Sequence, residues 1–326
     1  MKTKIFFILI TITFKLSAQF AGPVGSANTT AMHADSNAFV AWGAKCKVVR
    51  GYQDISNTSL GYASLGDSSM VPGKADGSSV VSLGDAGEAI VTFSFPINNG
   101  AGYDFAVFEN GFNNTFLELA FVEVSCDGIN FFRFPATSNS QTSTQFTNGA
   151  VMDATKIDNL AGKYRAMYGT PFDLQELVGA SSLLNVNSIT HVKIIDVVGS
   201  LNVLYARFDK NNNPINDPWP TPFASSGFDL DAVGVIHQAV GIKETNAGVI
   251  FKIFPNPVSS KFEVQSLKFS GNETVLIIKN CLGEELRRVK ITNEILEVEV
   301  TDLASGIYFV SIVLEDRIYI QKLIKE

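Results

Sequence analysis

The 326-residue sequence has no long hydrophobic run beyond residue 14, so no membrane-spanning helix is expected after that point. The one long run, "IFFILITITF" at residues 5–14, is too short to span a bilayer. Lys2 and Lys4 precede it, and "KLSA" follows it before Gln19. A basic start, a short apolar run and a small-residue exit predict a signal peptide over residues 1–18, cleaved after Ala18. A buried N-terminal strand is the competing interpretation.

Positive charge is scarce in the first two thirds of the chain. Residues 19–250 contain 12 Lys or Arg and 21 Asp or Glu, a balance of −9, whereas residues 251–326 contain 10 and 11. Between residues 51 and 132, Lys74 is the single cation among ten acids. This acidity argues against nucleic acid as a partner, because phosphates require Lys and Arg. It is compatible with cation binding, or simply with solubility.

Cysteine is also rare, and the three residues, Cys46, Cys126 and Cys281, show no CxxC spacing. Redox and zinc motifs are therefore not indicated. Export would permit a disulfide, so a Cys46–Cys126 pair and unpaired thiols both remain open.

The usual catalytic motifs are missing too, since the sequence has no GxSxG, no HExxH and no glycine-rich phosphate loop. We assign no catalytic residue. Carboxylates that could pair do occur on predicted strands, as a glycosidase would require: Glu109, Glu118 and Glu123, and Asp229 with Asp231. Solvent-facing or turn-capping acids are the competing interpretation.

Asp196 in "HVKIIDVVG" is a special case, because it shares strand parity with Val192 and Ile194. If that face is core, Asp196 needs hydrogen-bond donors or a cation. An exposed strand face is the competing interpretation.

What the sequence does contain favours an all-β protein. It has 25 Phe and 26 Gly, with short strand-like runs separated by turn signals. Asp127-Gly128 between two apolar runs predicts a hairpin, and "FDLQELVG" at 172–179 predicts a short helix. We expect a jelly-roll-like β-sandwich cargo domain over residues 19–240. A linker at 241–250 and a small immunoglobulin-like antiparallel β-sandwich at 251–326 should follow.

The stretch "DKNNNPIND" at residues 209–217 resembles a calcium-binding loop in its spacing. Its candidate oxygen ligands are Asp209, Asn211, Asn213, the carbonyl of Ile215, and Asp217. Pro214 stands where an EF-hand has glycine, so any site would borrow a carboxylate from Asp229 or Asp231. The sequence leaves two interpretations open here, a structural calcium ion and an Asn-rich polar turn whose side chains cap their own backbone.

Trp219 lies in "DPWPTPF", where prolines stiffen the chain. A rigid loop that presents Trp219 could stack on a sugar ring or another flat ligand. Plugging the end of the sandwich is the competing role.

The tail carries the most specific pattern in the chain: "FKIFPNPVSSKFEV", "NCLGEELRRVKI" and "VTDLASGIYFVSIVLEDRIYIQKLIKE". It resembles the type A C-terminal sorting domain of the type IX secretion system of Bacteroidetes. The resemblance rests on these landmarks: Pro255, Asn256, Pro257, Gly283, Gly306, Tyr308, Lys322 and Lys325. It implies a small β-sandwich, the type IX secretion machinery as partner, and delivery to the cell surface or medium.

Runs at 80–112, 118–135 and 214–238 also resemble an uncharacterised group of Bacteroidetes cell-surface proteins that bear this tail. We therefore expect an exported, non-enzymatic ligand-binding or adhesive protein, with a glycan or another environmental small molecule as ligand. The alternatives are a carboxylate-dependent polysaccharide-active enzyme, a structural surface or matrix component, and a corrinoid or nutrient capture protein.

Overall fold

The computed structural model describes residues 20–238, 251–266, 275–291, 293, 295–314 and 317–326. The predicted signal peptide and linker lie outside these residues. The chain separates into two compact units, Met1–Val240 and Gly241–Glu326, and each is described by itself. No helix among the described residues has the length and apolarity needed to cross a membrane.

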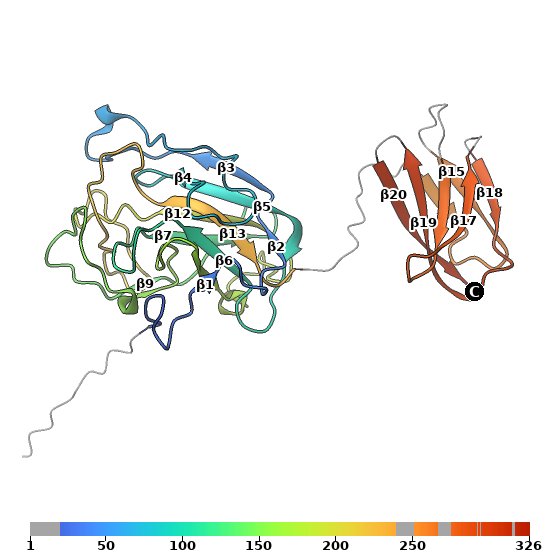
Figure 1. The fold of residues 1–326 in the computed structure, drawn as a ribbon, viewed down its shortest axis with the longest axis horizontal. Helices are drawn as coiled ribbons and strands as arrows, with labels where there is room; N and C mark the ends of the chain where they lie inside the picture. The colour runs from blue at the N-terminus through green and yellow to red at the C-terminus, as the bar shows by residue number, and fades with distance from the viewer. Residues whose placement is uncertain (1–19, 239–250, 267–274, 292, 294, 315–316) are drawn as a thin grey trace, which may run out of the picture. The chain divides into compact units, whose positions relative to one another are not determined.

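The protein is all-β, and its N-terminal unit contains two large antiparallel sheets (Figure 1). The six-stranded sheet has the order β1 (Met32–His33), β11 (Tyr168–Phe172), β6 (Phe105–Glu109), β13 (Asp229–Val235) and β2 (Ala41–Trp42), with β4 (Val81–Ser82) also paired to β13. The five-stranded sheet has the order β3 (Lys45–Val49), β5 (Glu88–Ile97), β12 (Ile189–Asp196), β7 (Ala120–Ser125) and β8 (Phe132–Arg133). A separate pair joins β9 (Thr137–Ser138) to β10 (Ile157–Asp158).

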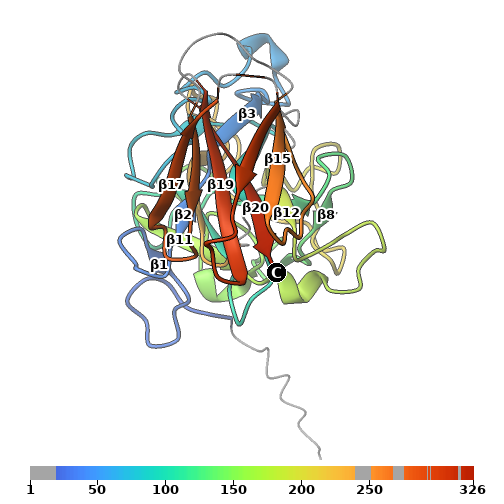
Figure 2. The same ribbon diagram turned by 90° about the vertical axis from the view of Figure 1, so that its right-hand side faces the viewer.

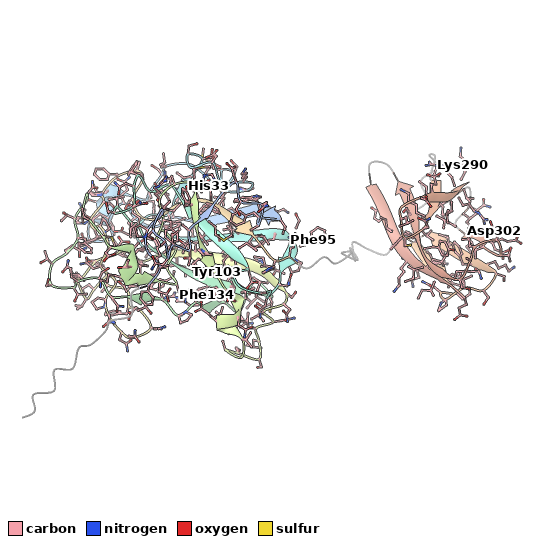
Figure 3. The ribbon with its side chains drawn as sticks, turned by 60° about the horizontal axis from the view of Figure 1, so that its bottom comes forward. His33, Phe95, Tyr103, Phe134, Lys290 and Asp302 are labelled. Atoms are coloured by element: carbon pink, nitrogen blue, oxygen red, sulfur yellow. The ribbon has the colours of Figure 1, made fainter. Side chains whose placement is uncertain are left out.

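One hydrophobic core joins the two large sheets. Alternate residues of the five-stranded sheet, such as Val91, Val122 and Ile194, form a cluster with Phe105 and Val233 of the six-stranded sheet. Phe134 also belongs to this cluster, and its ring lies 5.9 Å from that of Phe105. Figure 3 shows it inside the N-terminal unit.

Strands β6 and β13 are buried along their whole length, and apart from Glu109, Asp229 and Asp231 their side chains are apolar on both faces. A second cluster covers their other face, where Phe108 packs against Phe39 and Trp42. This explains why their sequences lack the polar alternation of a half-exposed strand. The two-layer arrangement agrees with the expected sandwich, and jelly-roll connectivity stays a prediction.

Two local predictions are confirmed in the N-terminal unit. A hairpin joins β7 to β8 through Asp127 and Gly128, and Gly128 has a φ of 75°. The short helix is a 3-10 turn, Leu174–Leu177, whose N-cap Asp173 accepts a hydrogen bond from the N–H of Gln175. The described residues contain two more 3-10 turns, Thr58–Leu60 and Ala154–Lys156, which the apolar pattern does not predict because each has only three residues.

The cysteines are unpaired. Cys46 in β3 aligns with Val91 in β5, which aligns with Val192 in β12 and then with Val124 in β7. Three strand spacings of about 4.8 Å therefore separate Cys46 from the strand that leads into Cys126. A disulfide requires a Cα separation below about 7 Å, so these two cysteines cannot form one in this fold.

The C-terminal unit contains two further antiparallel sheets, and Figure 2 shows β19 and β20 side by side. The first sheet has the order β14 (Phe251–Phe254), β15 (Lys261–Ser266) and β18 (Ile295–Glu299). The second has the order β17 (Glu285–Lys290), β16 (Val275–Lys279), β19 (Gly306–Leu314) and β20 (Arg317–Lys325). Phe262, Ile278 and Val310 are among the residues that form a core between them.

Candidate functional site

Acidic side chains gather at one end of the N-terminal unit. The strand register brings this end together, because Glu109 at the end of β6 lies beside Leu230, and Asp196 at the end of β12 lies opposite Ala120. The six acids come from six separate segments: Asp85, Glu109, Glu118, Asp196, Asp217 and Asp229. We call this set the acidic end.

Glu109 has the most unfavourable surroundings of the six. Its side chain is 1% exposed, and its Oε2 accepts a 2.7 Å hydrogen bond from the N–H of Gly111. Its Oε1 is buried and has no hydrogen-bond partner among the described residues. Burial first, and then the charge of Asp229, raise the pKa of Glu109 well above its ordinary value. A buried carboxylate oxygen of this kind requires a proton, a cation or a ligand donor.

Glu118 adds a second glutamate carboxyl group to the surroundings of Glu109. Its side chain is half-buried, so one part of the acidic end remains accessible to solvent. Burial is again the largest cause that raises the pKa of Glu118 well above normal, followed by the charges of Glu109 and Asp229. Two glutamates so placed cannot both be ionised at low cost without a counter-charge.

Asp229 lies near a positive charge, that of Arg50. Its carboxylate accepts a short hydrogen bond from the hydroxyl of Ser82, and the charge of Arg50 favours its ionised form. Burial outweighs both effects and raises the pKa of Asp229 to about 6. The guanidinium of Arg50 is also committed to backbone carbonyls, those of Leu65, Ser82 and Gly66. Arg50 alone does not balance the acidic end.

Asp196 anchors the surrounding loops. Its carboxylate accepts backbone hydrogen bonds from Ala86 at 3.0 Å, Val198 at 2.8 Å and Phe228 at 2.9 Å. Ala86 and Val198 both have positive φ, 60° and 65°, which is unfavourable for a β-branched valine. The three donors partly offset the burial that raises the pKa of Asp196 to about 6. Of the two positions that the sequence left open for Asp196, the structure shows the buried one, and the donors it requires are backbone amides.

Trp219 also belongs to this region. Its indole N–H donates a 3.0 Å hydrogen bond to Oδ2 of Asp85, which also accepts from the N–H of Ile55 at 2.8 Å. Burial and then the charge of Asp196 raise the pKa of Asp85 to about 7. The Trp219 ring is part-buried and lies 6.0 Å from the ring of Tyr205. Trp219 therefore forms part of the wall of the acidic end, and its role as a ligand platform stays a prediction.

The 209–217 segment folds as a polar turn in this structure. Oδ1 of Asp209 accepts from the N–H groups of Asn211 and Asn213, both at 2.8 Å. Oδ2 accepts from the N–H of Ser138 and from the side-chain amide of Asn213. Asn212 at the tip has a φ of 61°. All of the Asp209 oxygen atoms are thus occupied by the turn and its neighbour, as in the competing interpretation.

The remaining candidate calcium ligands lie at separate places. Ile215 is buried in a small hydrophobic cluster. Asp217 accepts a 2.6 Å bond from the N–H of Leu119 and joins Asp229 at the acidic end. Asp231 accepts from the N–H groups of Asp76 and Gly77. Within the described part of the chain, no three acidic, histidine or cysteine side chains are already gathered as metal ligands. Calcium binding therefore stays a prediction, with Asp217 and Asp229 its best-placed residues.

The loops of the acidic end also expose apolar side chains. Phe112 follows Glu109 closely in the chain and is 84% exposed, and Val203 and Leu204 precede Tyr205 with 83% and 76% exposure. Phe223 lies in the loop between Trp219 and Asp229 and is half-exposed. Exposed apolar side chains near a cluster of acids are compatible with a ligand-binding surface.

In the C-terminal unit, the sorting landmarks lie close together. Asn256 donates a 2.7 Å bond to the carbonyl of Lys322, and its Oδ1 accepts from the N–H of Ile324. Val258 forms a parallel bridge with Lys325, and the hydroxyl of Tyr308 donates to the carbonyl of Ala304. Gly283 has a φ of 84° in a turn, and Gly306 begins β19 opposite Lys325. The Pro255–Pro257 loop therefore fastens the last strand to the unit.

Residues 252–326 match the family model described as the secretion system C-terminal sorting domain. The C-terminal unit is this domain, as its motifs predicted. The domain indicates export to the cell surface or outer membrane and interaction with the type IX secretion machinery. A search of curated proteins found no match for the chain.

Solved structures resemble the chain only distantly. PorZ, described as an essential surface component of the type IX secretion system of Porphyromonas gingivalis, is 14% identical over 29% of this chain and 14% of its own, with a TM-score of 0.21. The BSP domain of a biofilm-associated protein is 9% identical over 89% and 52%, with a TM-score of 0.21. The β-glucuronidase of Ruminococcus gnavus is 12% identical over 75% and 38%, with a TM-score of 0.20. The chain spans about half or less of each of these proteins.

Proposed function

We propose that the N-terminal unit is a ligand-binding module exported to the cell surface, and that it binds a divalent cation, calcium first, at the acidic end. The observation that carries this proposal is the buried, unpartnered Oε1 of Glu109 beside the charges of Glu118 and Asp229. Calcium prefers carboxylate oxygen ligands and would supply the missing counter-charge.

The energetics support a functional role for these acids. Each buried carboxylate with a raised pKa costs folding free energy at neutral pH, and neutral or apolar replacements would relieve that cost. Acids that destabilise a fold and yet converge from six segments are a recognised signature of a functional site.

The position of the acidic end also suits a surface module. Asp229 begins β13 at the acidic end, whereas His237 and Gln238 follow β13 at its opposite end. The last described residues of the unit therefore lie at the end of β13 that is remote from Asp229. The exposed apolar loops then serve as contacts for an environmental ligand, a glycan or another small molecule, that the cation helps to hold.

Thermal melting of the mature chain, residues 19–326, tests the cation proposal. A cation at about 100 times its dissociation constant adds roughly 2.7 kcal/mol. For a unit of this size, that corresponds to a rise in melting temperature of about 5 to 10 °C. Glu109→Gln should abolish the rise in millimolar calcium, and Asp209→Ala should retain it. A rise that disappears only in Asp209→Ala would instead place calcium at the 209–217 turn.

A second candidate function is acid–base hydrolysis of a polysaccharide. The pair of Glu109 and Glu118 favours it, because one glutamate is buried and the other half-exposed, and both have raised pKa values. In that case Glu118→Gln should abolish release of reducing sugar from a susceptible glycan. Absence of hydrolysis across neutral and acidic glycans would leave the binding function.

A further inference from the structure

The outer face of the five-stranded sheet carries a row of side chains across all five strands, and four of the five strands contribute a charged residue to it. The register aligns Lys47 in β3 with Ile90 in β5, Ile90 with Lys193 in β12, and Lys193 with Glu123 in β7. Glu123 in turn aligns with Arg133 in β8. A neighbouring row begins at Lys45 and continues through Thr92 to His191.

The contacts in this row leave an excess of positive charge. Glu123 accepts two hydrogen bonds from Arg133, at 2.8 and 2.9 Å, and lies 3.8 Å from Nζ of Lys193. Lys45 and Lys47 are exposed on β3. Four cations and one acid give the two rows a net charge of +3, and we call the four cations with Glu123 the cationic strip.

Aromatic rings lie along the strip. Nζ of Lys193 lies 3.9 Å above the ring of Phe131, and the guanidinium of Arg133 lies 4.0 Å above the ring of Phe121. The ring of His191 is 6.3 Å from that of Phe131 and nearly perpendicular to it. These rings hold the long cationic side chains in place, so less side-chain entropy is lost when an anion binds.

The strip reverses the sign of the unit around it. Residues 20–238 contain 11 Lys or Arg and 20 Asp or Glu, a balance of −9. Four of those 11 cations lie in the strip. Surface lysines scattered for solubility would not align across the strands of one sheet, so the arrangement indicates an anionic partner.

We propose that the cationic strip binds an acidic polysaccharide that carries uronate or sulfate groups. Five strands span four spacings of about 4.8 Å, which gives the strip a length of roughly 19 Å and matches several sugar units of an extended chain. A small anion would need only one or two of the cations. The sorting domain takes the protein outside the cell, where acidic polysaccharides are exposed polyanions. This proposal is independent of the cation site at the acidic end.

Affinity measurements on the mature chain test it, with heparin as the sulfated probe, polygalacturonate as the uronate probe and dextran as the neutral control. The variant Lys45→Gln/Lys47→Gln removes two exposed charges from an edge strand. The matched control, Lys74→Gln/Lys156→Gln, removes two charges elsewhere in the same unit. The strip variant should weaken binding to at least one acidic probe by tenfold or more. In a plot of log K against the logarithm of the salt concentration, the slope should also become less steep by about two, roughly one for each lost charge.

Equal losses in the two double variants would overturn the proposal, because the effect would then be one of overall charge. Binding of dextran as tight as that of the acidic probes would also overturn it. The proposal would also be overturned if the protein bound double-stranded DNA more tightly than both acidic polysaccharides, because the polyanion would then be a nucleic acid. Far-UV circular dichroism checks that both variants are folded.

Discussion

Burial and then the charge of Glu109 raise the pKa of Glu118, and the two glutamates come from different segments that meet at the acidic end of the N-terminal unit. Each is held where its ionised form is disfavoured, and Glu109 keeps one oxygen without a partner. The acidic end therefore stores unfavourable electrostatic energy at neutral pH, which protons or a cation can release.

The first prediction concerns pH. Burial raises the pKa of Asp85 to about 7 and those of Asp196, Asp229 and Asp231 to about 6, above the ordinary value of 3.8. The folded state therefore binds more protons than the unfolded state between about pH 4 and 7, and its stability falls as the pH rises through that window. In EDTA, the N-terminal unit should melt at a higher temperature at pH 5 than at pH 8. A melting temperature that rises across this window would contradict the assignment.

The second prediction concerns the 209–217 turn. Asp209→Ala removes the acceptor for three backbone N–H groups, those of Ser138, Asn211 and Asn213. The Ser138 N–H is buried and would lose its partner, so we expect a loss of about 1 to 3 kcal/mol in unfolding free energy. Chemical denaturation measures it. The exposed Asn211→Ala is the matched control and should change stability by less than about 0.5 kcal/mol.

How far the sequence predicts these features depends on how local they are. The turn chemistry of Asp209 and the core-facing parity of Asp196 concern neighbouring residues, so side-chain spacing and strand periodicity bring each out as one of two alternatives, and the fold decides between them. The sorting domain can also be predicted from the sequence, because the motif around Asn256 and the residues of the last strand form a fixed pattern. The sequence also marks Glu109 and Glu118 as acids that could pair, but the expected neighbouring strands are wrong, because Glu118 precedes β7 and β6 and β7 belong to different sheets.

The remainder of the acidic end depends on long-range pairing. Asp85 lies in a loop with no distinctive spacing, and it meets Trp219 only because the fold brings residues 134 positions apart together. The cationic strip is hidden for the same reason, because its register joins β3, β12 and β8 across the chain. Single-sequence patterns do not define which strands are neighbours.

A third prediction addresses Trp219. Trp219→Phe keeps an aromatic ring and removes the indole donor, so the pKa of Asp85 should rise further and the unit should lose about 1 to 2 kcal/mol of stability at pH 7. The loss should shrink at pH 5, where Asp85 is protonated in both proteins. Denaturation at the two pH values measures it. An equal loss at both would mean that ring packing, rather than the hydrogen bond, accounts for the effect.

The fourth prediction concerns export. Deleting residues 251–326 removes the whole sorting domain, so the cargo unit should accumulate in the periplasm of a host with type IX secretion. Fractionation with immunoblotting measures the distribution, and intact mass should show a mature start at Gln19. Normal surface levels of the truncated protein would show that another signal directs export.

The most direct test of the acidic end is calorimetric titration of the mature chain with calcium near pH 6, in two buffers of different ionisation enthalpy. If calcium replaces protons on Glu109, Glu118 and Asp229, binding releases protons and the observed heat differs between the buffers. The account predicts binding with net proton release, both lost in Glu109→Gln. Calcium that does not bind, or that binds without proton release and equally well to Glu109→Gln, would contradict it.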